Sequence, residues 1–205
     1  MFFLGARWRA AQTIRLSNQK ASGGDATIDR IRPYLASLRG AVLEIGAGAG
    51  GTMPYLPVGC RYTALEPNVY LRDTLIRRAG ERGLTTPVIS TASAEQMPFA
   101  DSSFEAIVSV RSLCAVSDLP RTLREVRRVL KPGGIFIFAE HVAAPANQWQ
   151  YYLQLLARLV FPCDPVRNIE RELRAAGFHE LRVERFNSFK SKTIIQPRIS
   201  GFARN

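Results

Sequence analysis

The sequence contains few cysteines and no long hydrophobic run. Only three cysteines occur in 205 residues, none of them in a CxxC pair, so neither a disulfide framework nor a zinc site is expected. This cysteine usage favours a reducing, cytoplasmic setting. No apolar stretch approaches the roughly 20 residues that a membrane-spanning helix needs. Internal repeats, low-complexity tracts and a secretory signal are also lacking, which favours one globular domain without a metal.

Acidic residues are scarce relative to basic ones. The chain has 28 Lys and Arg against 17 Asp and Glu, a formal net charge of +11. The basic residues are spread over several expected helices, and there is neither an Arg-rich tail nor an RNA-binding aromatic signature. This distribution argues against a nucleic-acid partner. It leaves solvated basic faces, or a preference for anionic membrane surfaces or acidic ligands.

Short apolar runs alternate with amphipathic segments along most of the chain. Strands are expected at 41–45, 61–65, 87–91, 104–110 and 135–140, and helices at 25–38, 68–79 and 120–130. This alternation predicts an α/β fold with a parallel, doubly wound sheet. An amphipathic stretch at 149–161 and a helix near 167–176 follow. Two extended segments, 178–186 and 193–203, then predict an antiparallel pair added to the sheet.

Glycines alternate where the first expected strand ends, at Gly46, Gly48 and Gly50. Glycine readily takes positive φ there, lets a ligand approach the backbone, and leaves amide N–H groups free to bind it. Gly46, Gly48 and Gly51 also satisfy the GxGxxG pattern, and Glu66 ends the next strand about 20 residues on, where it can accept hydrogen bonds from a ribose. The pattern therefore predicts a nucleotide-like cofactor site.

Three features favour S-adenosylmethionine (SAM) over a dinucleotide at this site. Glu44 precedes the turn, where its charge can face the ammonium of an amino acid, directly or through water. A dinucleotide site would gain nothing from this negative charge beside its phosphates. The Ser93-Ala94-Glu95 segment follows the third strand and can contact the edge of an adenine. In addition, most nicotinamide dehydrogenases would require a second, substrate-binding domain, and none is expected after the sheet.

Four motifs in this order resemble those of class I SAM-dependent methyltransferases. They are Glu44-Ile45-Gly46-Ala47-Gly48-Ala49-Gly50, Leu65-Glu66-Pro67, Ser93-Ala94-Glu95…Pro98-Phe99…Asp101…Ser103-Phe104, and Leu130-Lys131-Pro132-Gly133-Gly134. The resemblance covers residues 41–140. It implies a Rossmann-like, seven-stranded, mostly parallel sheet with an antiparallel last strand and helices on both faces. It also implies SAM as the cofactor and S-adenosylhomocysteine as its product.

A narrower resemblance extends over most of residues 41–205. Its segments are Ser112-Leu113-Cys114-Ala115-Val116, Glu140-His141-Val142-Ala143-Ala144, Trp149, Cys163 with Arg167, Ala176-Gly177-Phe178, and Pro197-Arg198-Ile199-Ser200-Gly201-Phe202-Ala203. They are similar to the methyltransferase-like 7 group, membrane-associated enzymes implicated in methylating small thiols. The resemblance implies a small, lipophilic acceptor, with a thiol as one possibility. The alternatives are O-, N- or C-methylation of a lipid, quinone or secondary metabolite, and a cofactor-binding protein without methyl transfer.

The expected site residues fall into three groups. The cofactor-binding residues are Glu44, Gly46, Ala47, Gly48, Gly50, Glu66, Pro67, Asn68, Ser93, Ala94, Glu95, Arg111, Ser112 and Leu113, the last three lining either the methionine end of the cofactor or the acceptor. His141 follows the fifth strand and is the candidate general base, since an unperturbed pKa near 6.5 suits proton removal near neutrality; a structural histidine is the alternative. The acceptor pocket is expected to include Trp8, Cys114, Trp149 and Tyr152.

The whole chain, 1–205, is expected to form a single methyltransferase domain. Within it, 1–38 is an N-terminal helical lid or anchor, 41–140 the cofactor-binding core, and 141–205 the acceptor-side helices and C-terminal antiparallel strands. Residues 1–16 mix aromatic and basic side chains, which suits either a lid over the site or an interfacial helix on an anionic membrane. The expected location is cytoplasmic, with peripheral membrane contact through 1–16. The sequence leaves the acceptor atom, the pathway and the oligomeric state open.

Overall fold

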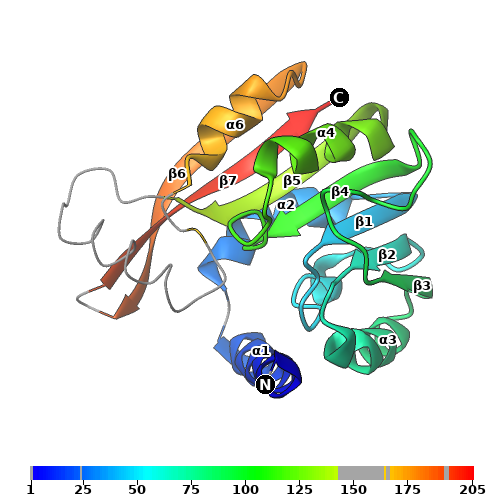
Figure 1. The fold of residues 1–205 in the computed structure, drawn as a ribbon, viewed down its shortest axis with the longest axis vertical. Helices are drawn as coiled ribbons and strands as arrows, with labels where there is room; N and C mark the ends of the chain where they lie inside the picture. Colours follow the sequence, from blue (N-terminus) through cyan, green and yellow to red (C-terminus); the bar gives the residue numbers. More distant parts are fainter. Residues whose placement is uncertain (1, 24, 143–163, 165–166, 192–193) are drawn as a thin grey trace.

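The described chain forms one seven-stranded sheet between helices. The structure is a computed structural model, and it describes all residues except 1, 24, 143–163, 165–166 and 192–193 (Figure 1). The strands are β1 (Ala41–Ile45), β2 (Arg61–Leu65), β3 (Thr85–Ser90), β4 (Phe104–Val110), β5 (Leu130–His141), β6 (Glu180–Ser191) and β7 (Ile194–Arg204). Their order across the sheet is β3-β2-β1-β4-β5-β7-β6. Pairing from β3 to β5 is parallel, whereas β7 runs antiparallel to both β5 and β6. The expected Rossmann-like sheet is confirmed.

The helices lie on both faces of this sheet. They are α1 (Phe2–Gly23), α2 (Ala26–Ser37), α3 (Arg72–Glu81), α4 (Leu119–Val129) and α6 (Ile169–Ala175), with short 3-10 turns η1 (Met53–Tyr55) and η2 (Val69–Leu71). Figure 1 shows α4 and α6 near each other on one side, and α1 apart from them, beyond α2. The amphipathic stretch expected at 149–161 lies outside the described residues.

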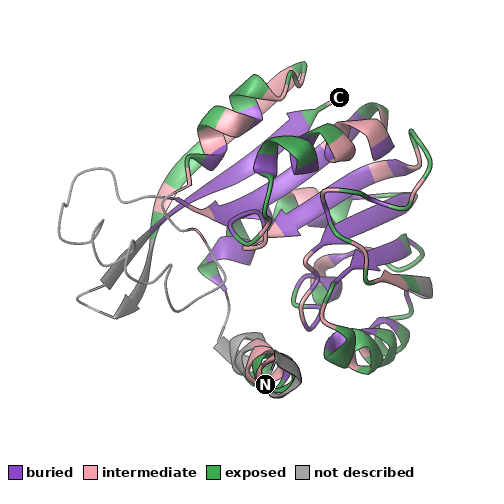
Figure 2. Ribbon diagram, viewed as in Figure 1, coloured by how far each residue is buried: buried purple, intermediate pink, exposed green. Residues whose placement is uncertain are grey.

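Side-chain alternation along the central strands divides the core into two layers. Val42 and Val108 belong to the layer that packs against α2 and α3, whereas Leu43 and Ile107 belong to the layer under α4 and α6. All five residues of β1 are buried, as a central parallel strand covered on both faces must be. Figure 2 shows this buried centre in purple. The carboxyl ends of β1 and β4, where the strand order reverses, are therefore held by a well-packed core.

Local signals explain where several elements begin. Asp25 caps α2, because its side chain accepts a hydrogen bond from the Thr27 backbone N–H, and Asp118 caps α4 in the same way. The Lys131-Pro132-Gly133-Gly134 segment ends α4, and Gly133 takes a φ of +73° there. The strand β5 already begins at Leu130, earlier than the expected 135, and its pairing with β4 shifts register across this segment.

Candidate functional site: a glycine turn between two carboxylates

The glycine turn after β1 adopts a backbone that only glycine takes readily. Gly46, Gly48 and Gly50 have φ values of +64°, +57° and +77°. At Gly46 the space is closed as well, since an added Cβ would lie 2.4 Å from the Cβ of Ser112. The Gly46 N–H donates to the Leu65 carbonyl oxygen at 2.7 Å, which ties the turn to the end of β2. The turn is thus held rigidly where the strand order reverses.

Glu44 is a buried carboxylate directly beneath this turn. Its side chain is only 3% exposed, and its Oε2 accepts hydrogen bonds from Thr52 Oγ1 at 2.6 Å and Tyr62 OH at 2.5 Å. Burial raises the pKa of Glu44 to about 7, and nearby Glu66 adds to this, whereas the hydroxyl groups and the positive charge of Arg111 oppose it. A cation beside Glu44 would restore its ionised form. The site therefore suits an ammonium group.

Glu66 joins the end of β2 to the glycine turn. Its Oε2 accepts a hydrogen bond from the Gly48 backbone N–H at 2.8 Å, and its Oε1 accepts one from the Asn68 N–H at 2.9 Å. Burial raises the pKa of Glu66, and these two N–H groups oppose that shift. Each carboxylate oxygen keeps capacity for a second hydrogen bond. The Asn68 amide also donates to the Ala6 carbonyl oxygen at 3.2 Å, so α1 reaches this corner of the site.

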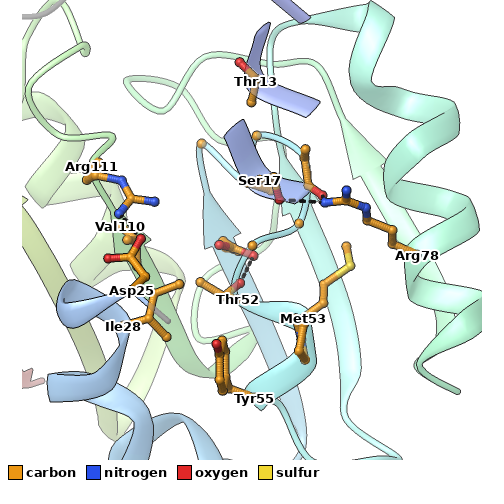
Figure 3. Close-up of a pocket in the computed structure, with 18 of the residues that line it drawn as sticks. Thr13, Ser17, Asp25, Ile28, Thr52, Met53, Tyr55, Arg78, Val110 and Arg111 are labelled. Atoms are coloured by element: carbon orange, nitrogen blue, oxygen red, sulfur yellow. Dashed lines mark hydrogen bonds and ion pairs between the residues drawn. The ribbon is translucent and has the colours of Figure 1, made fainter. Parts of the chain in front are cut away.

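A cavity of about 550 Å³ opens beside the glycine turn, and its size suits a small-molecule ligand. The lining residues are Thr13, Ser17, Asp25, Ile28, Glu44, Gly46, Ala47, Gly48, Ala49, Gly50, Gly51, Thr52, Met53, Pro54, Tyr55, Arg78, Glu81, Arg82, Val110 and Arg111 (Figure 3). Helix α1 contributes Thr13 and Ser17 to the wall. Arg78 of α3 fastens that wall, because its guanidinium donates to Ser17 Oγ at 2.8 Å and to the Ala49 carbonyl oxygen of the turn.

A group of charged side chains lies at the end of the cavity that β4 forms. Arg111 follows β4 with a φ of +58°, a conformation that costs roughly 1–3 kcal/mol for a residue with a Cβ. Its Nη1 donates to Asp25 Oδ2 at 2.6 Å, and both residues line the cavity. Figure 3 shows these two side chains reaching toward each other from β4 and α2. Strain kept at a cavity wall points to a functional position.

Glu140, near the end of β5, supports the Arg111 turn from behind. It is fully buried, and its Oε1 accepts hydrogen bonds from Ser109 Oγ at 2.7 Å and from the Ser112 and Leu113 N–H groups at 3.2 Å each. Burial raises the pKa of Glu140 to about 7, against the opposing effect of these donors and of Arg111. Among the described residues, Oε2 of Glu140 has no hydrogen-bond partner.

Some of the residues expected at the site do line this cavity. They are Glu44, Gly46, Ala47, Gly48, Gly50 and Arg111. Ser112 lies next to them, because its Oγ donates to the Ile45 carbonyl oxygen at 2.8 Å, whereas Leu113 is buried in the core layer under α4. Glu66, Pro67 and Asn68 are outside the lining, although Glu66 bonds to the turn itself.

The segment expected to hold an adenine is tied to its neighbours instead of lining the cavity. Ser93 Oγ donates to one Glu95 oxygen, and the other oxygen accepts from the Ser117 and Asp118 N–H groups at 2.6 and 3.2 Å. Burial raises the pKa of Glu95, but these donors outweigh it and lower the pKa overall. Ala94 packs into the core. Glu95 therefore anchors the loop that leads into α4.

None of the described residues expected around the acceptor is part of the cavity lining. His141 ends β5 opposite Arg198 of β7 and is half-buried. Cys114 is buried, whereas Trp8 on α1 is 64% exposed. Trp149 and Tyr152 lie outside the described residues. Within the described ranges, no cluster of three His, Cys, Asp or Glu side chains could hold a metal, and none of the helices is long and apolar enough to cross a membrane.

Sequence reasoning missed several cavity residues. Asp25 was recognisable as a helix cap. Its ion-pair partner Arg111 lies 86 positions away, however, and no local sequence pattern predicts that pair. Thr52 and Arg78 likewise take part through tertiary contacts with Glu44 and α1. The arginine spacing on α3 gave no sign of that role.

The residues present fit SAM. Positive-φ glycines leave room for a ligand against the backbone, Glu44 suits an ammonium, and Glu66 has acceptor capacity at the next strand. Fold and site together define a class I methyltransferase, and a family sequence model described as a methyltransferase domain matches residues 43–138.

The chain belongs to the SAM-dependent methyltransferase family. It is 36% identical to the human thiol S-methyltransferase TMT1A over 170 residues, which are 80% of this chain and 70% of that protein. The human thiol S-methyltransferase TMT1B is 36% identical over 157 residues, 73% of this chain and 64% of that protein. In fold, the chain matches a SAM-dependent methyltransferase from Aquifex aeolicus with a TM-score of 0.67 and 15% identity, over 95% of this chain and 97% of the other.

Proposed function

We propose that this methyltransferase acts on a small thiol and converts it to a methyl thioether. The observation that carries the proposal is its 36% identity to thiol S-methyltransferases over up to 80% of the chain. The cavity agrees with a small acceptor, since about 550 Å³ lies within the range of small-molecule sites. Apolar side chains such as Ile28, Met53 and Val110 line part of it and favour a lipophilic acceptor.

The proposed cofactor contacts follow from the described positions. Glu44 faces the ammonium end, the turn from Gly46 to Gly50 receives the cofactor against its backbone, and Glu66 accepts hydrogen bonds from the ribose hydroxyls. The adenine contact of Ala94 and Glu95 is proposed for the backbone of that segment, because the Glu95 side chain is held by neighbouring residues and Ala94 packs into the core. Bound SAM supplies a sulfonium methyl group that is already activated for transfer. The main task of the chain is therefore to orient the reactants with the reacting atoms near 3–3.5 Å and to exclude water.

A thiol acceptor needs little help from a base. Its pKa near 8.5 leaves a few per cent as thiolate at pH 7. With SAM bound, the thiolate sulfur would bond to the methyl carbon as the bond between that carbon and the sulfonium sulfur breaks, and S-adenosylhomocysteine would leave. The thiol proton would be released beforehand to water or to His141. An oxygen or nitrogen acceptor of higher pKa would depend much more on His141.

Turnover on a panel of acceptors tests this proposal. The protein is incubated with SAM and equal concentrations of thiols, phenols, amines and lipids, and S-adenosylhomocysteine is measured as the product. We expect product with thiols, and turnover confined to phenols, amines or lipids would refute the proposal. Calorimetry with SAM, S-adenosylhomocysteine and NAD is the companion measurement, and NAD binding without SAM binding would refute the cofactor contacts.

We further propose that α1 is a lid that contacts anionic membranes peripherally. Arg78 and Asn68 hold α1 against the site, while Trp8, Val69 and Tyr70 are exposed next to Arg7, whose guanidinium lies 5.8 Å from the Tyr70 ring centroid. Aromatic and basic residues together suit the membrane interface.

Co-sedimentation with vesicles of anionic phospholipid tests this second proposal without removing the lid. We expect Trp8→Ser to lower the pelleted fraction relative to the unaltered chain. The matched control is Val88→Ser, because Val88 is an exposed apolar residue on β3, away from α1. Equal pelleting of the unaltered chain and Trp8→Ser would remove the membrane contact.

A further inference from the structure

Charged groups from five elements surround the end of the cavity at Arg111. Asp25 comes from α2, Glu44 from β1, Glu140 from β5 and Arg198 from β7, and each interacts electrostatically with Arg111 or with its ion-pair partner. Of these groups, Arg111 and Asp25 form a direct ion pair at the cavity wall, with side chains 25% and 7% exposed. The rest of the group is almost entirely buried. Arg111 is thus the cation of this cluster that a ligand can reach.

The backbone at Arg111 is held in place independently of the ion pair. The Arg111 N–H donates to the Ala139 carbonyl oxygen at 3.0 Å, and the next two N–H groups donate to Glu140. Ser112 packs closely on Gly46 and donates to the Ile45 carbonyl oxygen. These contacts fix the backbone at Arg111, which has positive φ, relative to the glycine turn. The turn fixes the direction in which the Arg111 side chain leaves the backbone, and the ion pair with Asp25 orders the guanidinium, so binding an anion there freezes less side-chain motion.

The local charge near neutral pH is about balanced. Asp25 is already stabilised without Arg111, because its Oδ1 accepts the Thr27 N–H at the N-terminus of α2, where the helix dipole is positive. Arg111 and Arg198 face Asp25, Glu44 and Glu140, and burial brings the last two carboxylic acids near half protonation at pH 7. Burial also lowers the pKa of Arg198, and the positive charge of Arg111 contributes to this. An anion that reaches the guanidinium of Arg111 therefore meets no excess of negative charge, and the N-terminus of α2 can stabilise Asp25 while Arg111 binds that anion.

We propose that Arg111 is a specificity-determining residue that binds an anionic group of the methyl acceptor, either its reacting thiolate or a carboxylate elsewhere on the same molecule. This inference rests on the proposed methylation of small thiols. In the absence of acceptor, Asp25 acts as the counter-ion of Arg111 and weakens the attraction of Arg111 for other anions. The planar guanidinium can donate to a carboxylate through two N–H groups, whereas it meets a thiolate as a charge.

Two acceptors of nearly equal size test the proposal. They are 4-mercaptobenzoate, which carries a carboxylate, and its uncharged methyl ester. The variants are Arg111→Met, which removes the charge, and Asp25→Asn, which removes the counter-ion but keeps a residue that caps α2 well. Arg121→Met is the matched control, because Arg121 is exposed on α4 and its loss lowers the net charge equally. Thermal melting and calorimetry with S-adenosylhomocysteine show that each variant is folded and binds cofactor.

The two sources of the anion give different results. If the carboxylate is bound, Arg111→Met lowers kcat/KM for the acid about tenfold or more relative to the ester, and Asp25→Asn raises that ratio. If the thiolate is bound, Arg111→Met lowers kcat/KM for both acceptors, and the rate profile shifts to higher pH because the thiol must ionise unaided. Unchanged acceptor kinetics and pH profile in Arg111→Met would overturn the proposal. It would be overturned equally by weaker S-adenosylhomocysteine binding as the sole effect, which would assign Arg111 to the cofactor.

A direct binding measurement separates this inference from the proposed function. Benzoate cannot be methylated at sulfur, and its calorimetric titration into the S-adenosylhomocysteine complex reports on Arg111 alone. Binding that is lost in Arg111→Met and kept in Arg121→Met supports the anion site even if no thiol is turned over. The opposite result is also informative. If thiols are methylated, but Arg111→Met changes neither the benzoate affinity nor kcat/KM for either acceptor, the proposed function stands and the role of Arg111 is refuted.

Discussion

Replacing Glu44 with glutamine should change how the stability of the protein depends on pH. The Glu44 carboxyl has a pKa of about 7 in the folded protein, against 4.5 for an ordinary glutamate. Between these values the folded state holds a proton that the unfolded state has released. The free energy of unfolding therefore falls as the pH rises through this window, and the loss is complete above pH 7.

The size of the effect follows from the difference in pKa. About 1.4 kcal/mol per pKa unit makes the cost of ionised Glu44 roughly 3 kcal/mol at pH 8. Glu140, with a pKa also of about 7, adds a similar term, and Glu66, whose pKa burial also raises, adds one of the same sign. Glutamine keeps an oxygen that can accept the hydrogen bonds from Thr52 and Tyr62. We expect the decline in stability between pH 5 and 8 to be roughly 2.5 kcal/mol smaller in Glu44→Gln than in the unaltered protein.

Urea unfolding at a series of pH values, followed by circular dichroism, measures this directly. The control is Glu184→Gln, because Glu184 is an exposed carboxylate on β6, and its pH curve should run parallel to that of the unaltered protein. All other titratable groups are shared by the variant and the unaltered protein, so their contribution largely cancels in the comparison. Parallel curves for Glu44→Gln and the unaltered protein would refute the reasoning that burial keeps this carboxyl protonated.

Three further variants test the site. Glu66→Ala should weaken S-adenosylhomocysteine binding by about tenfold or more in calorimetry, because it removes the proposed ribose acceptor and also the acceptor for the backbone N–H groups of Gly48 and Asn68. Unchanged affinity would contradict the ribose contact. Gly46→Ala should lower the free energy of unfolding by about 2 kcal/mol or more, since the added Cβ would clash with Ser112. The control, Gly51→Ala, should be nearly neutral, because no atom lies within 4 Å of its added Cβ. Equal melting temperatures of the two variants would argue against a rigid turn. His141→Ala should reduce turnover of a phenol far more than that of a thiol, and unchanged rates at every pH with the preferred acceptor would exclude the base role.

The local order of motifs determined much of the fold. The run from Val42 to Ile45 is apolar except for Glu44, which predicts a buried strand, and the glycines that follow allow the positive-φ turn that the structure shows. The parallel strands and the antiparallel end were predictable for the same reason, because hydrophobic period and turn residues are properties of neighbouring positions. Strand ends were less certain, and β5 begins at Leu130 because the segment after α4 already pairs with Phe104.

The sequence by itself thus determined the class of fold, the cofactor and the position of two carboxylates, because each follows from residues close together in the chain. Only the tertiary structure decided that Arg111 would meet Asp25 across 86 positions, and that Glu95 would hold a loop instead of lining the cavity. It also decided that Glu44 and Glu140 would be buried deeply enough to raise their pKa values. Charge pairing and desolvation depend on which distant segments pack together, and no local pattern encodes that.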